Sequence, residues 1–101
     1  AVRYKLPLLV VISNNSSFYN DELHQERVAI ARDRPVENKW IGQKMIEPDV
    51  SIAKIAEGQG AAGFGPVHTI GELAGEFAKA IAVVEAGGVA VVDVRVVPGY
   101  A

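Results

Sequence analysis

The sequence predicts an α/β fold in which helices cover a parallel sheet, and three stretches of the chain carry this prediction. Residues 8–13 and 89–97 are aliphatic runs without strict alternation, typical of strands buried on both faces of a sheet. Residues 69–87 place apolar side chains at the spacing of an amphipathic helix. The whole chain has the expected order β-α-loop-α-β-α-β, which predicts part of a Rossmann-like parallel sheet with right-handed crossovers.

The first half of the chain is expected to form one strand, one helix and a long loop. After the strand at residues 8–13, Asn20 can cap a helix that runs to about residue 33. Asp21 and Glu22 fall in its first turn, where the helix dipole favours carboxylates. Residues 34–47 are polar and are punctuated by proline and glycine, so they predict a surface loop, and loops of this length often carry function.

The second half is expected to form a short helix, a strand, a long helix and a final strand. Asp49 can cap the short helix, which runs through residue 59 and is ended by Gly60, and a brief strand is expected at residues 61–67. Thr69 and Glu72 have the spacing of a capping box and predict the start of the long helix. The buried stripe of that helix is expected to contain Ile70, Leu73, Ala74, Phe77, Ile81 and Val84.

The composition allows one domain and excludes several classes of partner. The 101 residues carry 10 Lys and Arg against 12 Asp and Glu, and a net charge of −2 gives no footprint for the phosphate backbone of a nucleic acid. With no cysteine and two histidines, the chain is not expected to form a thiolate or histidine-rich metal site. The apolar stretch at residues 6–12 is too short to span a membrane, so we expect a soluble, cytoplasmic protein.

Three glycines, Gly58, Gly60 and Gly63, match the spacing of the G-x-G-x-x-G dinucleotide-binding motif. That motif needs a strand before it and a helix after it, whereas here the end of a helix precedes the glycines and a short strand follows them. We therefore interpret them as a helix C-cap and as positions of close helix-to-strand packing.

Two adjacent asparagines, Asn14 and Asn15, follow the first expected strand directly, and Ser16 and Ser17 come next. Ligands of open α/β sheets bind at the carboxyl ends of the strands, which is where these amides are expected. The same four residues also suit a polar turn between a strand and a helix, because Asn and Ser form such turns readily. The residues alone leave both interpretations open.

The order of these features resembles that of a known family. The features are Leu6 and Pro7 before an aliphatic run, Asn14 and Asn15 after it, a polar helix, a long loop, an Ala-rich helix between Asp49 and Gly60, the capping box and a final strand that contains Asp93. Over essentially its whole length the chain resembles the C-terminal half of the diphosphate-binding domain of thiamine diphosphate enzymes. It is most similar to the branch of acetolactate synthase, benzoylformate decarboxylase and 2-hydroxyacyl-CoA lyase.

The resemblance is to one half of that family's cofactor-binding motif. The motif opens with Gly-Asp-Gly and closes with paired asparagines, and this chain holds the closing half without a Gly-Asp-Gly sequence. The chain also starts without Met, in residues that read like the last turn of a helix. We therefore expect residues 1–101 to be the C-terminal portion of the domain, with the rest of the enzyme upstream.

The resemblance implies two cofactors, thiamine diphosphate and Mg²⁺, at the paired asparagines. Mg²⁺ takes oxygen ligands and is commonly shared between a protein and phosphate groups. By resemblance, Asn15 gives its side-chain oxygen to the metal and Ser17 its backbone carbonyl oxygen, while Asn14 braces the turn. The residues expected to bind the cofactor are Asn14, Asn15, Ser16, Ser17, Phe18 and Tyr19.

The start of the next helix supplies the candidate catalytic residues. In the pyruvate decarboxylase branch an acidic residue stands six places after the ligand asparagine, and that place here is Asp21. The resemblance thus makes Asp21 and Asn20 candidates for substrate contact or proton transfer. His24, one turn further on the same helix face, is a candidate proton shuttle. Equally, Asn20 and Asp21 suit a helix cap and first turn, and His24 suits a solvated helix face.

Two functions from different classes follow. The leading hypothesis is a fragment of a thiamine diphosphate- and Mg²⁺-dependent lyase, decarboxylase or synthase that makes or breaks a C–C bond next to a carbonyl of a 2-keto or 2-hydroxyacyl substrate. The resemblance implies a homodimer or homotetramer, and it implies that the remainder of the enzyme supplies the Gly-Asp-Gly half-motif and the pyrimidine-binding domain. The fragment alone is then inactive. The alternative is a small non-catalytic Rossmann-like module that binds a ligand or partner at residues 14–18.

Overall fold

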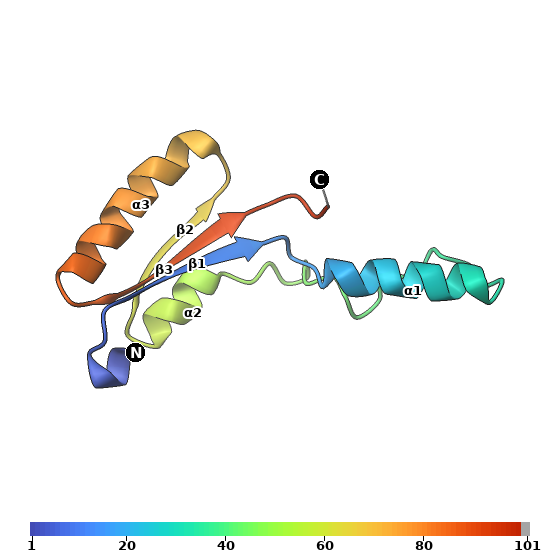
Figure 1. The fold of residues 1–101 in the computed structure, drawn as a ribbon, viewed down its shortest axis with the longest axis horizontal. Helices are drawn as coiled ribbons and strands as arrows, with labels where there is room; N and C mark the ends of the chain where they lie inside the picture. The colour runs from blue at the N-terminus through green and yellow to red at the C-terminus, as the bar shows by residue number, and fades with distance from the viewer. Residues whose placement is uncertain (100–101) are drawn as a thin grey trace. The chain divides into compact units, whose positions relative to one another are not determined.

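The computed structural model describes residues 1–99, in which three parallel strands form one sheet (Figure 1). The elements are η1 (Val2–Tyr4), β1 (Leu8–Asn14), α1 (Tyr19–Ala31), α2 (Ile52–Gly58), β2 (Ala62–Val67), α3 (Ile70–Glu85) and β3 (Val89–Arg95). They fall into two compact units. The sheet unit comprises residues 1–14 and 51–96, and the helix–loop unit comprises residues 15–50 with the described residues after 96.

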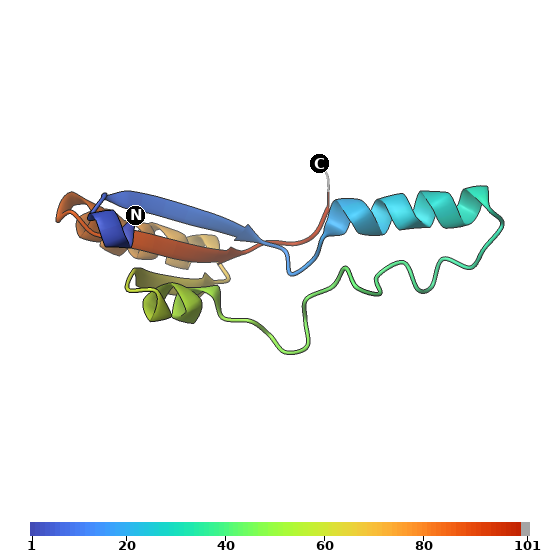
Figure 2. The same ribbon diagram turned by 90° about the horizontal axis from the view of Figure 1, so that it is seen from below.

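The sheet has the strand order β1-β3-β2, so the last strand of the chain lies in the middle (Figure 2). The β1–β3 register runs from Leu8 opposite Val89 to Asn14 opposite Arg95. β2 pairs with the other edge of β3, with an irregularity between Phe64 and Val67. The predicted fold class is confirmed, because parallel strands connected through helices form the sheet.

The helices α2 and α3 cover opposite faces of the sheet. A Cβ atom on Gly63 of β2 would meet the backbone of Ala53 in α2. The next residue, Phe64, packs instead against the core cluster that contains Ala80 of α3. Since successive residues of a strand point to opposite faces, the two helices lie on different sides.

The core of the sheet unit lies between α3 and the two strands β2 and β3. Its buried members are Val67, Ala80, Ala90 and Val92. The sequence predicted that the first strand would be buried on both faces, and this is wrong for the described residues, because Leu8 and Val11 are 45% and 47% exposed. The reason is position: β1 lies at the edge of the described sheet, whereas β3 in the centre is covered on both faces.

Two helix starts differ from the expected ones. The N-cap position of α1 is Phe18 instead of Asn20, which lies inside the first turn, and the helix ends at Ala31. The N-cap of α2 is Ser51 instead of Asp49, and its side chain accepts a hydrogen bond from Lys54 N at 3.3 Å. A serine two places after an aspartate offers the same kind of acceptor, so the sequence alone does not separate these two caps.

The capping box of α3 is confirmed in full. The hydroxyl of Thr69 accepts a hydrogen bond from Glu72 N, and the Glu72 carboxylate accepts hydrogen bonds from the backbone N–H groups of His68 and Thr69. Hydrogen bonds from these backbone N–H groups lower the pKa of the Glu72 carboxyl, and the one from His68 has the largest effect. His68 therefore contributes to the helix start through its backbone, and its side chain is exposed.

The glycines of the discounted dinucleotide motif serve packing, as interpreted from the sequence. Gly60 follows α2 with a φ of +86°, a conformation that favours glycine at the end of a helix. At Gly63 an added Cβ would lie 2.2 Å from the carbonyl oxygen of Ala53. The absence of a side chain thus lets α2 approach β2 closely.

Replacing Gly63 by Ala should lower the free energy of unfolding by about 3 kcal/mol, because backbone atoms of α2 must move to admit the new methyl group. Gly75→Ala is the matched control: no atom lies within 4 Å of its added Cβ, and a helix interior gains about 1 kcal/mol from this change. Urea unfolding of both variants measures the difference. Equal stabilities for the two variants would contradict the packing argument.

Candidate functional site

The carboxyl end of β1 is fixed to β3 through side chains as well as backbone. Asn14, the last residue of β1, donates from its side-chain Nδ2 to Asp93 Oδ1 at 2.9 Å and accepts from Val96 N at 3.0 Å through its backbone oxygen. Asp93 is fully buried, and its Oδ2 lies 3.6 Å from Arg95 Nε. The two contacts of the carboxylate therefore come from the last residues of β1 and β3.

A tight turn begins the helix–loop unit. The side-chain oxygen of Asn15 accepts a hydrogen bond from Ser17 N at 3.0 Å, two residues further on, which is the geometry of an Asx turn. Ser16 between them has a φ of +52°, in the left-handed region that such a turn uses. The side chain of Asn15 therefore shapes the turn in which it lies.

The long loop after α1 returns to this turn and holds it. Phe18 N donates to Gln43 O at 2.9 Å, and Met45 N donates to Ser16 O at 2.8 Å, so that Ser17 and Lys44 form an antiparallel bridge. Figure 2 shows the loop running back along α1. Residues 34–47 are thus a loop, as predicted, and their function in the fold is to pair with the turn.

A second contact inside the helix–loop unit involves a residue that sequence reasoning did not single out. The hydroxyl of Ser17 donates a hydrogen bond to the carboxylate of Glu22, which is 5% exposed. Phe18 O accepts from the backbone N–H groups of Asp21 and Glu22. The only sequence signal for Glu22 was an acidic residue in a first turn, and the neighbouring Asp21 carries the same signal.

An ion pair joins the loop to α1. Lys39 Nζ lies 2.8 Å from Glu26 Oε2. The hydrogen bond from Lys39 to Glu26 raises the pKa of the Lys39 ammonium. Both side chains are about one-third exposed, so this pair fixes geometry more than it adds to stability.

Two oxygens of the turn fit a hard cation such as Mg²⁺. The carbonyl oxygen of Ser17 accepts no hydrogen bond within residues 1–99, and the side-chain oxygen of Asn15 has a second lone pair after accepting from Ser17 N. Neutral amide and carbonyl oxygens are suitable ligands for Mg²⁺ shared with phosphate groups. Across the same described residues, no group of three or more His, Cys, Asp or Glu side chains is placed to hold a metal ion.

The candidate catalytic residues lie on the first two turns of α1. Asn20, Asp21 and His24 are exposed, and Phe18 and Tyr19 precede them. The side chains of Asp21 and His24 make no hydrogen bond or ion pair with each other or with another described residue. The structure thus brings Asn15, Ser16, Ser17 and Phe18 into one turn, and it leaves Asp21 and His24 apart on the helix surface.

Comparison with known families identifies the family to which the domain belongs. The profile described as "Thiamine pyrophosphate enzyme, C-terminal TPP binding domain" matches residues 1–94, almost the whole chain. The chain belongs to this family of thiamine pyrophosphate enzymes. No curated protein and no solved structure matches the sequence. Among the residues that the structure describes, no helix has the length and apolar character needed to cross a membrane.

Membership of the thiamine pyrophosphate family supports the resemblance found in the sequence. It shows that the chain is a cofactor-binding domain of a thiamine diphosphate-dependent enzyme. The observed α/β sheet is consistent with the fold of that domain. The family match assigns no role to a single residue, so the ligand and catalytic roles of residues 14–24 remain predictions.

Replacing Asp93 by Ala should lower the free energy of unfolding by about 3 kcal/mol, because the change removes a buried carboxylate from its partners Asn14 and Arg95. Asp93→Asn keeps an acceptor for Asn14 and should cost less. Glu85→Ala, at an exposed carboxylate on the end of α3, should change the value by less than about 0.5 kcal/mol. Urea unfolding tests all three, and an Asp93→Ala effect as small as that of Glu85→Ala would contradict this reading.

Proposed function

We propose that residues 14–19 form the closing half of a site for Mg²⁺ and the diphosphate of thiamine diphosphate, in an enzyme that makes or breaks a C–C bond next to a carbonyl. The observation that carries this proposal is the turn itself. It presents two oxygens, Asn15 Oδ1 and the carbonyl of Ser17, in a domain of the thiamine pyrophosphate enzyme family. The proposed substrates are 2-keto or 2-hydroxyacyl compounds, and the proposed branch is that of lyases, decarboxylases and acetolactate synthase-like enzymes.

The residues of the turn have distinct proposed roles. Asn15 and Ser17 would hold Mg²⁺ through neutral oxygens, which add ligands without adding charge beside an anionic diphosphate. Ser16, Phe18 and Tyr19 lie between the metal ligands and the start of α1. The amino end of this 13-residue helix carries the positive end of its dipole, which favours phosphate groups.

Hydrogen bonds hold the turn before any ligand is present. Ser17 is fixed through its N–H by Asn15 and through its hydroxyl by Glu22. The backbone on either side of Ser17 is paired with the returning loop. A ligand set that is already positioned loses less conformational entropy when the metal binds.

Thiamine diphosphate, when bound, supplies an electron sink for carbon–carbon chemistry next to a carbonyl. The chain's own contribution would come from the first turns of α1. Asp21 is exposed and has no side-chain partner in the described residues, so its carboxylate is available to hold or move a substrate proton. Asn20 would contact the substrate, and His24 would relay a proton.

The remaining parts of the enzyme are proposed to lie outside residues 1–101. These parts are the Gly-Asp-Gly half of the motif, the pyrimidine-binding domain and a second copy of the enzyme in a homodimer or homotetramer. If the full protein that contains this chain bound no thiamine diphosphate, the alternative of a non-catalytic binding module would take the place of this proposal.

In the full protein, Asn15→Ala should weaken thiamine diphosphate binding in the presence of Mg²⁺ by at least about tenfold, since ligand and outer-shell changes at metal sites have effects of this size or more. Asn15→Asp keeps an oxygen for the metal and an acceptor for Ser17 N, so it should bind more tightly than the Ala variant. Gln59→Ala, an exposed amide in the sheet unit, is the control. Titration calorimetry measures the affinities. Unchanged affinity in Asn15→Ala would remove Asn15 from the metal site.

A second variant tests the catalytic assignment. Asp21→Asn should lower kcat by about a hundredfold, the usual contribution of a positioned acid or base, while leaving cofactor affinity unchanged. Asp33→Asn is the control, because Asp33 is also an exposed aspartate of the helix–loop unit and its φ of +52° is tolerated by Asn. Steady-state kinetics on a 2-keto acid measures both. A full kcat in Asp21→Asn would leave this residue as a first-turn carboxylate with no catalytic function.

A further inference from the structure

A hollow on the side of α1 lies outside the proposed cofactor ligands and shares only His24 with the proposed catalytic residues. It has a volume of about 490 Å³ and is lined by His24, Gln25, Val28, Ala29, Arg32 and Arg34. A second hollow of about 200 Å³ shares Gln25, Ala29 and Arg34 with the first and continues toward Lys39 in the loop. We call the two together the α1 groove. All of its lining residues belong to the helix–loop unit.

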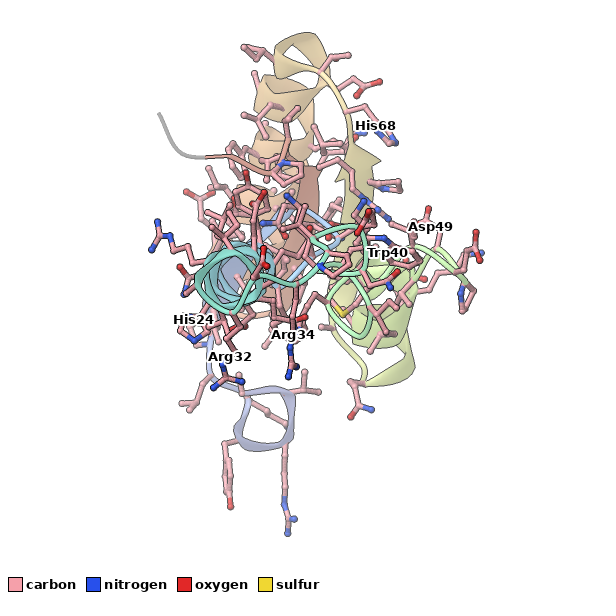
Figure 3. All side chains as sticks on the ribbon, turned by 90° about the vertical axis from the view of Figure 1, so that its right-hand side faces the viewer. His24, Arg32, Arg34, Trp40, Asp49 and His68 are labelled. Atoms are coloured by element: carbon pink, nitrogen blue, oxygen red, sulfur yellow. The ribbon has the colours of Figure 1, made fainter. Side chains whose placement is uncertain are left out.

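The charged side chains that line the α1 groove are all basic. Figure 3, which looks along α1, shows His24, Arg32 and Arg34 on the same side of the helix. The described lining of the two hollows contains no carboxylate. The positive charge of Lys39 is balanced by the carboxylate of Glu26. Arg32 and Arg34 therefore carry the unpaired positive charges of the groove.

The acidic residues nearby do not pair with these arginines. Arg32 and Arg34 make no side-chain hydrogen bond or ion pair with any of residues 1–99. Asp33 stands between them in the sequence without lining either hollow. Arginines near the C-terminal end of a helix also interact favourably with its dipole. The dipole places about half a negative charge at that end, which is less than the two positive charges of the guanidinium groups. The guanidinium groups of Arg32 and Arg34 are therefore available to bind a ligand.

The groove has a basic end and an apolar floor. Arg32 and Arg34 lie at the end of α1, while His24 lies eight residues before Arg32, about 12 Å along the helix axis. The half-buried Val28 and Ala29 lie between them, beside Gln25. A guanidinium group fits phosphate oxygens in a forked geometry, and an apolar floor fits the carbon body of a ligand.

We propose that the α1 groove binds a small organic phosphate ester, with the phosphate on Arg32 and Arg34 and the carbon body over Val28 and Ala29. This site is separate from the Asn15–Ser17 turn and goes beyond the proposed cofactor function. Gln25 offers a hydrogen bond to the body of the ligand, and His24 closes the far end of the groove.

The test is titration calorimetry of the full protein with phenyl phosphate, in the presence of saturating thiamine diphosphate and Mg²⁺. Phenyl phosphate should bind more tightly than inorganic phosphate, because it alone reaches the apolar floor. The double variant Arg32→Gln, Arg34→Gln should bind both at least about tenfold more weakly, since charge-assisted hydrogen bonds are the strong ones. Val28→Thr should weaken phenyl phosphate and leave inorganic phosphate unchanged.

Arg27→Gln is the matched control, because Arg27 lies on α1, is exposed and does not line the groove. Equal weakening by Arg27→Gln and by the double variant would show a general charge effect and overturn the proposal. Failure of the wild type to bind phenyl phosphate would overturn it too, as would release of thiamine diphosphate by the probe. Thiamine diphosphate affinity is measured separately in each variant, so a failure of the cofactor proposal is distinguishable from a failure of this one.

Discussion

A buried carboxylate at the carboxyl end of the sheet is the constraint on which the arrangement of the strands depends. Asp93 is fully buried in the central strand, and an unmatched charge there would cost several kcal/mol. The carboxylate is matched by the amide of Asn14 on β1 and by the guanidinium of Arg95 on its own strand. A slip of one residue between β1 and β3 would turn Asn14 to the other face of the sheet and leave Asp93 without its amide donor. The buried charge therefore specifies a register that the aliphatic residues of both strands would not specify alone.

This constraint explains why two asparagines follow one another. Asn14 uses its N–H group to bond the sheet, and Asn15 uses its oxygen to bond the turn. An aspartate in place of Asn14 would put two carboxylates in contact, whereas an aspartate in place of Asn15 would keep the acceptor and add a charge. The amide is thus required at the first position as a donor and favoured at the second as a neutral oxygen. One residue type serves two needs because its side chain both donates and accepts.

Local patterns in the sequence predicted the sheet, the capping box of α3 and the close packing at Gly63, because each depends on residues near one another in the chain or on a single period of apolar side chains. The pairing of the turn with residues 43–45 was not predictable in this way, since that stretch has no strand pattern and its partner lies far away in the sequence. Likewise, Glu22 and Asp21 carry the same first-turn signal, and only the fold buries Glu22 beside Ser17. The family was recognisable because features in the same order run along almost the whole chain, with the paired asparagines among them. The functions of individual side chains were not, because they depend on contacts across the fold.

The helix–loop unit is held mainly by polar contacts, and this links its stability to its ligands. Its large apolar side chains are widely exposed, with Ile30 and Ile41 at 66% and 57%, so little of its stability comes from apolar burial. A hydrogen bond adds about 1 kcal/mol net, whereas a ligand present at a hundred times its Kd adds about 2.7 kcal/mol to the state that binds it. The carbonyl of Ser17 and the guanidinium groups of Arg32 and Arg34 are among the groups that have no partner within residues 1–99, and they are assigned here to ligands. A ligand bound at these groups would therefore stabilise the folded unit by as much as two or three of its internal hydrogen bonds. Ligand binding and folding of this unit are thermodynamically coupled.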